Sequence, residues 1–202
     1  MLDPDSIRRT LAKLGNRDWP DTWGPREHKT IGDFEGWTHQ YQLNERLSPE
    51  TLHAFEELHS VILPDCYRMF LCELGNGGAG PHYGIYALGT DEHGPLRGAI
   101  LENLKSCFVY EEDWDGPFDE ELDFSDDLMQ GAMPIATRGC AMTYWMVVTG
   151  PQKGQISCDD RAHGNRIEPV ENEGGNRLTF DAWYMNWLIR ADKTWGHSRK
   201  LQ

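Results

Sequence analysis

The stretch of this 202-residue chain that most restricts its fold is residues 63–88, LPDCYRMFLCELGNGGAGPHYGIYAL. Its apolar residues between Tyr67 and Leu74 recur at the spacing of one helix face, and Gly75 follows as a helix stop. Asn76 and the glycines after it can adopt the positive φ of a tight turn, and YGIYAL then has a strand-like composition. The stretch therefore predicts a helix, a glycine turn and a strand in direct succession.

The glycine turn is a poor candidate for a phosphate-binding loop. Such a loop needs a strand, then glycines with Lys and Ser or Thr, then a helix whose N-terminus is directed at the anion. Here the helix comes first, so its partially negative C-terminal end faces the glycines, and no lysine lies beside them. We interpret the glycines as a structural turn.

The remaining patterns predict helices first, strands in the middle and a helix last. A helix is expected after Asp3-Pro4, and a second after Ser48-Pro49 with Leu52, Phe55 and Leu58 as its apolar stripe. Weaker helical spacing is found at 97–108, strand patterns at 132–138, 142–150 and 154–160, and a closing helix at 179–192. This order is typical of an α+β fold in one domain.

The charge of the chain restricts its partners. Thirty-three acidic and 19 basic residues give a net charge of −14, which argues against binding nucleic acid or an anionic membrane. Five scattered cysteines form neither a disulfide framework nor a zinc motif. The first residues lack the apolar core of a signal peptide, and no apolar run could span a bilayer. We therefore expect a cytoplasmic protein whose partner, if charged, is basic.

One segment concentrates this charge. Residues 111–127, EEDWDGPFDEELDFSDD, contain ten carboxylates and no basic residue. They fit a solvated loop, a surface for a basic protein, or, without the spacing of a calcium loop, a cation site. As partner-binding candidates we take the carboxylates and two apolar anchors within it: Glu111, Glu112, Asp113, Trp114, Asp115, Phe118, Asp119, Glu120 and Glu121.

No catalytic template is found in the sequence. There is no HExxH and no GxSxG, and the eight histidines are dispersed. An enzyme or metal site built on His82, His163, Asp159 and Asp160 stays open as an alternative, because DDRAHGN gathers polar groups after a strand. We expect no catalytic residue, no metal and no cofactor.

Three segments in this order resemble the SUKH superfamily, the Smi/Knr-like proteins. They are LPDCYRMFLCELGNGG with YGIYAL, then MPIATRGCAMTYWMVVTGPQKGQIS, then FDAWYMNWL. The resemblance implies a bent, mainly antiparallel sheet flanked by helices. Residues 1–202 would form a single SUKH-like domain, with a core at about 48–190 and a helical, aromatic N-terminal extension at 1–47.

The resemblance also implies a function. Bacterial members of this superfamily are mostly immunity proteins that neutralise toxins, often nucleases, delivered between competing cells, and they are not known as enzymes. We therefore expect a protein that binds a cognate, basic, nuclease-type toxin and uses neither nucleic acid nor membrane. The alternative is a non-enzymatic regulatory or scaffolding protein of the Smi/Knr type without a toxin partner, as in the fungal relatives.

Overall fold

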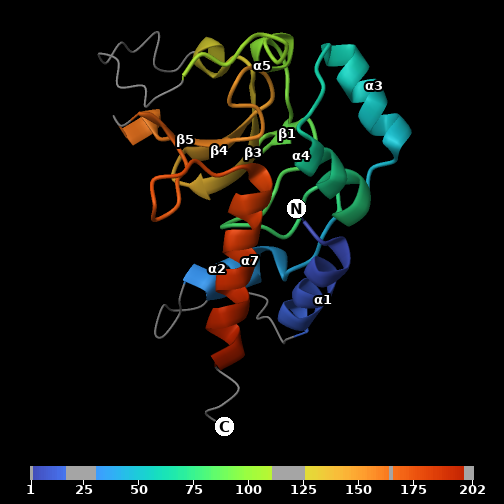
Figure 1. The fold of residues 1–202 in the computed structure, drawn as a ribbon, viewed down its shortest axis with the longest axis vertical. Helices are drawn as coiled ribbons and strands as arrows, with labels where there is room; N and C mark the ends of the chain where they lie inside the picture. Colours follow the sequence, from blue (N-terminus) through green and yellow to red (C-terminus); the bar gives the residue numbers. More distant parts are fainter. Residues whose placement is uncertain (1, 17–30, 111–125, 164–165, 198–202) are drawn as a thin grey trace.

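The computed structural model describes residues 2–16, 31–110, 126–163 and 166–197 (Figure 1). The elements, in chain order, are α1 (Pro4–Gly15), α2 (Ile31–His39), α3 (Pro49–His59), α4 (Asp65–Met69), the π-helical turn η1 (Phe70–Leu74), β1 (Thr90–Asp91), β2 (Gly94–Pro95), α5 (Ala99–Glu102), the 3₁₀ turn η2 (Asp126–Met129), β3 (Ala132–Gly139), β4 (Met142–Val147), β5 (Ile156–Asp159), the 3₁₀ turn η3 (Arg161–His163), β6 (Ile167–Pro169) and α7 (Phe180–His197). The predicted α+β class is confirmed.

The main sheet is an antiparallel meander in the order β3-β4-β5-β6, and β1 and β2 form a separate small hairpin. Register shifts interrupt the pairing of β3 with β4 between Pro134 and Ala136 and again between Thr137 and Gly139. Such irregularities bend a strand and increase its local twist. The sheet is therefore antiparallel, as the family resemblance implied.

The central strand β4 is packed on both faces. Tyr144 and Met146 belong to the main core, whereas the alternating residues Trp145 and Val147 belong to a second cluster with Phe108. Successive side chains of a strand point to opposite faces, so each face of the sheet has its own apolar cover. This arrangement explains why MTYWMVV reads as a continuous apolar run rather than as an alternation of apolar and polar residues.

The last helix, α7, organises the main core. It runs along the long axis of the molecule, with α1 and α2 beside its lower half (Figure 1). Tyr184 and Trp187 are almost completely buried on α7. Lys13 of α1 forms an ion pair with Asp192 at 2.5 Å, which joins the first helix to the last. The N-terminal extension therefore packs against the body of the protein.

The glycine turn is structural, as predicted, but the strand after it is not formed. Gly75 ends η1, and Gly78 has a φ of +99° and makes isolated bridges to Leu43 and Ile85. Ile85 in turn bridges Ala136 of β3, so YGIYAL contributes isolated bridges instead of a ladder. Positive φ values at His82 and Gly84 interrupt the extended backbone that a longer strand requires.

Two further expectations were wrong. The helical spacing at 97–108 yields only the four-residue α5, because turns follow it from Asn103. Leu58, predicted on the buried stripe of α3, is 77% exposed. The inward side of α3 instead carries Leu52 and Glu56, whose carboxylate accepts the Leu63 backbone N–H at 2.8 Å.

Gly78→Ala tests the close approach at the glycine turn. A Cβ on Gly78 would lie 2.6 Å from the Gln42 carbonyl oxygen and 2.8 Å from two further backbone atoms. Gly94 has a similar φ of +115°, but a Cβ there would meet nothing within 4 Å. Gly94→Ala is thus a matched control for backbone strain alone.

We expect Gly78→Ala to lower the free energy of unfolding by about 1–3 kcal/mol more than Gly94→Ala does. Urea denaturation followed by circular dichroism measures both values. Equal losses for the two variants would contradict the packing of the glycine turn against residues 42–44.

Candidate functional site

An open groove with a volume of about 1240 Å³ lies beside α7. Its lining comes from Glu35 on α2, residues 81–82 after the glycine turn, residues 138–144 of β3 and β4, residues 170–178, and residues 183–194 of α7. Pockets for small molecules usually measure about 300–1,000 Å³ and enclose their ligand. The groove exceeds this range and is open.

A buried carboxylate joins three of these segments. The Glu35 side chain is only 4% exposed. Its Oε1 accepts the backbone N–H of His82 at 3.0 Å, and its Oε2 accepts the indole N–H of Trp187 at 3.1 Å. Burial raises the pKa of Glu35, while these two hydrogen bonds and the charge of Arg190 act in the opposite direction. The floor of the groove is therefore fixed by one residue of α2.

His82 forms the next part of the groove. Its ring stacks on Tyr144 with centroids 5.8 Å apart and planes inclined by 10°, and its carbonyl accepts the Thr38 hydroxyl at 3.1 Å. Burial, and then the positive charges of Arg138 and Arg190, lower the pKa of His82 to about 4. The imidazole is consequently neutral at pH 7, so it forms no charged pair with Glu35, 3.9 Å away.

His39 holds the glycine turn against α2. Its Nδ1 accepts the Tyr41 backbone N–H at 3.0 Å, which places the ring proton on Nε2, 2.8 Å from the Gly80 carbonyl oxygen. The ring also contacts Trp187 edge-on, with centroids 5.7 Å apart. Burial lowers the pKa of His39 to about 4, and both ring nitrogens are occupied by backbone groups. We assign this histidine a structural role.

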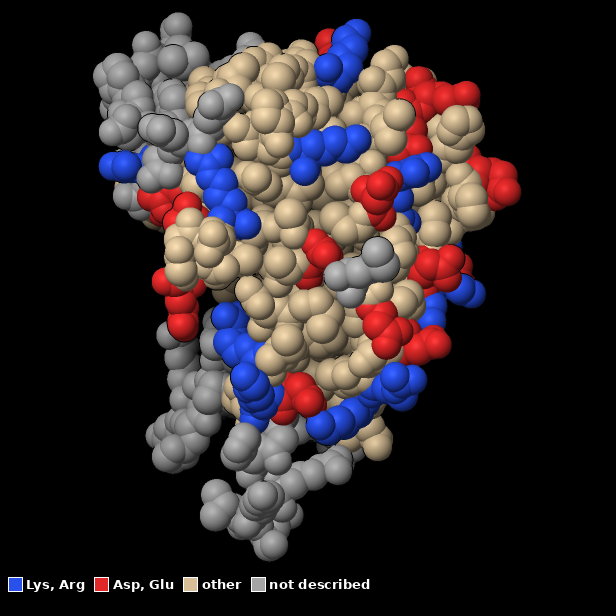
Figure 2. Space-filling view, in the orientation of Figure 1, with Lys and Arg blue, Asp and Glu red and all other residues tan. Residues whose placement is uncertain are grey.

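The rim of the groove carries both signs of charge. Arg138, Arg190 and Lys193 contribute positive charge, and Glu171 and Glu173 contribute negative charge. Lysine, arginine and acidic side chains are also interspersed over the face shown in Figure 2. The described surface is thus not uniformly acidic, although the chain carries a net charge of −14.

All nine predicted partner-binding residues, Glu111, Glu112, Asp113, Trp114, Asp115, Phe118, Asp119, Glu120 and Glu121, lie outside the described parts of the chain. The residues that flank their segment are described. Phe108 on one side and Leu128 and Met129 on the other belong to the same second cluster on the sheet, and Tyr110 packs against it. The described residues on the two sides of this segment therefore pack in one apolar cluster.

The residues of the enzyme or metal alternative are not assembled. Asp159 forms a two-pronged pair with the buried Arg161 at 2.8 and 2.6 Å. His163 Nδ1 lies 2.5 Å from Asp160, whereas His82 contacts Tyr144 and Glu35. Within the described ranges, no group of three or more His, Cys, Asp and Glu side chains is placed to hold a metal ion.

Comparison with known families places this fold. The described chain combines an antiparallel meander, a helix–glycine turn and a groove beside α7. The SMI1 / KNR4 family (SUKH-1) matches residues 46–181, about two thirds of the chain, so the chain belongs to this family. Its members are generally non-catalytic immunity or regulatory proteins. No curated protein and no solved structure matches the chain significantly.

Sequence reasoning missed most of the groove. Glu35 lies in the N-terminal extension at 1–47, where no site residue was predicted, and its partners are 47 and 152 residues away in the chain. The aromatic residues Trp183 and Trp187 were predicted only as part of the closing helix at 179–192.

Among the helices that the structure describes, none is both long and apolar enough to cross a membrane.

The two buried histidines give a testable pH dependence. Because the folded state lowers their pKa values from 6.5 to about 4, their stabilising contribution is complete above pH 6.5 and is lost as the pH falls through 4. Glu35, with its raised pKa, partly offsets this loss at the acidic end.

We expect the NMR signals of the His39 and His82 rings to show neutral imidazoles from pH 8 down to about 5. The same rings in the urea-unfolded chain should titrate near 6.5 and serve as the control. A midpoint near 6.5 for either ring in the folded protein would contradict its described burial.

Proposed function

We propose that the protein is a cytoplasmic immunity protein that binds a cognate protein toxin and blocks it by contact. The observation that supports this proposal most strongly is the open groove beside α7 in a family whose members are generally non-catalytic. The groove is large enough for a loop of a partner, and its pre-formed walls would reduce the entropy cost of binding.

The chemistry of the groove suits protein recognition. Tyr144 and Trp183 line the groove with 8% and 6% of their surface exposed, and the exposed Arg138 and Arg190 line it as well. Tryptophan, tyrosine and arginine are the residue types that most often contribute the binding energy of protein interfaces. Glu35, beneath them, keeps Trp187 in place through its indole N–H. We propose that a segment of the toxin occupies this groove.

The acidic segment would supply long-range attraction. Residues 111–125 carry eight carboxylates and no basic residue, which accounts for more than half of the net charge of −14. A nuclease must present basic side chains to phosphates, so its surface is complementary to this segment. Attraction of this kind raises association rates by about 10- to 1,000-fold at low ionic strength. We propose a basic, nuclease-type toxin as the partner.

A toxin gene beside the gene for this protein would supply the binding probe. Titration calorimetry of the purified toxin domain against the wild-type protein measures affinity at low and at high salt. Nanomolar binding supports the immunity function. The absence of such a neighbour, or of binding, would favour a regulatory or scaffolding protein of the Smi/Knr type.

Neutralising the acidic segment tests the electrostatic part of the proposal. The variant changes Glu111, Glu112, Asp113, Asp115, Asp119, Glu120 and Glu121 to their amides, which preserves shape and removes seven charges. We expect toxin association at low salt to slow by about tenfold or more and to lose most of its salt dependence. Stopped-flow fluorescence measures this rate.

The matched control neutralises seven exposed carboxylates elsewhere: Glu45, Glu57, Asp65, Glu73, Glu92, Glu102 and Glu168. Its net charge equals that of the first variant, so a difference between the two reports the position of the charge. If both variants slow association equally, only the total charge matters, and the assignment of the segment is wrong.

A further inference from the structure

Two arginines on the groove have no acidic partner among the residues that the structure describes. Within the described residues, neither the Arg138 nor the Arg190 side chain takes part in an ion pair or a hydrogen bond. Both are exposed and line the same groove. The chain has 33 acidic residues for 19 basic ones, so two guanidiniums without a partner in the described ranges, beside one hollow, are unexpected on composition alone.

The two guanidiniums act on the same place. They extend from different elements, Arg138 from β3 and Arg190 from α7, and the positive charge of each reaches both His82 and Tyr144. Tyr144 is 8% exposed, and its hydroxyl lies 3.4 Å from His82 Nε2. The stacked pair of His82 and Tyr144 thus lies in the groove with one arginine from β3 and one from α7.

The nearest buried carboxylate does not neutralise these charges. Glu35 feels the charge of Arg190, but its two oxygens already accept the N–H groups of His82 and Trp187. Glu171 and Glu173 line the groove as well, without an ion pair to either arginine among the described contacts. The space above the His–Tyr pair therefore offers positive charge to an incoming group.

We propose that the groove seats a carboxylate side chain of the bound protein above Tyr144, between Arg138 and Arg190. This inference rests on the proposed function, because it names the group through which the toxin segment is held. Arginine matches the planar carboxylate with paired N–H donors, which gives direction as well as energy. Partial shelter within the groove strengthens such a contact relative to open solvent.

A carboxylate fits better than a phosphate or a nucleic acid strand. A polyanion would meet Glu171 and Glu173 on the same rim and the overall charge of −14. A single acidic residue on an otherwise basic toxin avoids this repulsion, since its basic neighbours would face the two glutamates. The positions of the positive and negative side chains on the rim would thus fix how the partner segment is aligned along the groove.

An experiment without the toxin tests whether the groove binds a carboxylate. The probe is a short peptide with blocked ends and one central glutamate, compared with the same peptide carrying glutamine and with inorganic phosphate. NMR follows the indole signals of Trp183 and Trp187 at up to about 0.1 M of each probe. We expect the glutamate peptide alone to shift these signals, and the shifts to be lost in Arg138→Gln/Arg190→Gln.

Three results would contradict the proposed carboxylate site. They are no shift with the glutamate peptide, equal shifts with the glutamine peptide, and shifts retained in the arginine variant. Shifts with phosphate but not with the glutamate peptide would also contradict it, and would point to a phosphate ligand. Because no toxin is present, these outcomes are independent of the immunity function.

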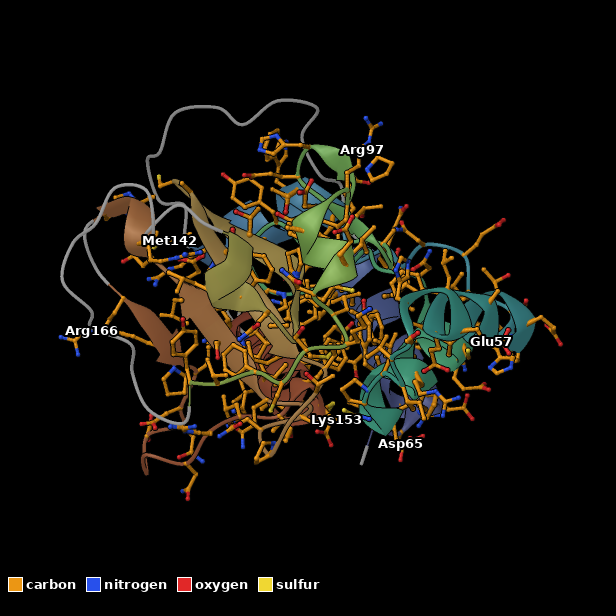
Figure 3. All side chains as sticks on the ribbon, turned by 90° about the horizontal axis from the view of Figure 1, so that it is seen from above. Glu57, Asp65, Arg97, Met142, Lys153 and Arg166 are labelled. Atoms are coloured by element: carbon orange, nitrogen blue, oxygen red, sulfur yellow. The ribbon has the colours of Figure 1, made fainter. Side chains whose placement is uncertain are left out.

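A second experiment measures the affinity for the toxin domain. We expect Arg138→Gln/Arg190→Gln to raise its dissociation constant by about 10- to 100-fold. The matched control, Arg97→Gln/Lys153→Gln, removes the same charge from two exposed residues that lie outside the groove and are labelled in Figure 3. It should change affinity less than about threefold.

The two failures are distinguishable. If the wild-type protein binds the toxin and the arginine variant binds equally well, the proposed carboxylate site is wrong and the immunity function stands. If the wild-type protein binds no toxin, the proposed function fails, and the peptide titration alone decides whether the groove recognises a carboxylate.

Discussion

The buried carboxylate of Glu35 is the interaction on which the groove depends. It accepts the backbone N–H of His82 and the indole N–H of Trp187, so it connects α2, the glycine turn and α7 at one point. Leaving a buried acceptor without its donors lowers the free energy of unfolding by about 1–3 kcal/mol, and leaving the donors unsatisfied has a similar cost. These two hydrogen bonds therefore hold the three segments together, although the segments lie far apart in the sequence. His39 adds a second link between α2 and the turn through the Gly80 carbonyl group.

The groove combines a shared framework with individual parts. Residues 46–181 match the family and include the sheet, the glycine turn and the loop at 170–178. Glu35 precedes this span, and Trp183, Trp187 and Arg190 follow it. The family framework thus supplies one wall, and the two ends of the chain supply the floor and the other wall. Under the proposed function, partner specificity would change at the two ends while the sheet stays the same.

Local patterns predicted the parts of the fold that depend on neighbouring residues. The helix before Gly75 and the strands β3, β4 and β5 follow from apolar spacing and turn residues within short windows. The helix α2 was missed because its Trp- and Gly-containing sequence, IGDFEGWTH, has no clear apolar stripe. Leu58 has the spacing of a core residue, yet α3 stands at the edge of the molecule with Glu57 projecting outward (Figure 3). Periodicity identifies an apolar face but not whether another element covers it.

The candidate site was less predictable than the fold. Glu35 and Trp187 are joined across 152 residues, and no local signal relates them. The acidic segment was conspicuous in the sequence because charge is visible without structure, and its role stays a prediction. The paired arginines were not noticeable, since Arg138 lies in a strand and Arg190 near the end of a helix. Their common position appears only once the antiparallel sheet and α7 are placed side by side.

Hydrogen–deuterium exchange in the presence and absence of the neighbouring toxin domain tests most directly whether the groove receives a partner. We predict slower exchange at residues 81–82 and 171–174, which line the groove, and unchanged exchange in the β1–β2 hairpin. Slower exchange confined to α3 and residues 57–62, with no change at the groove, would contradict it.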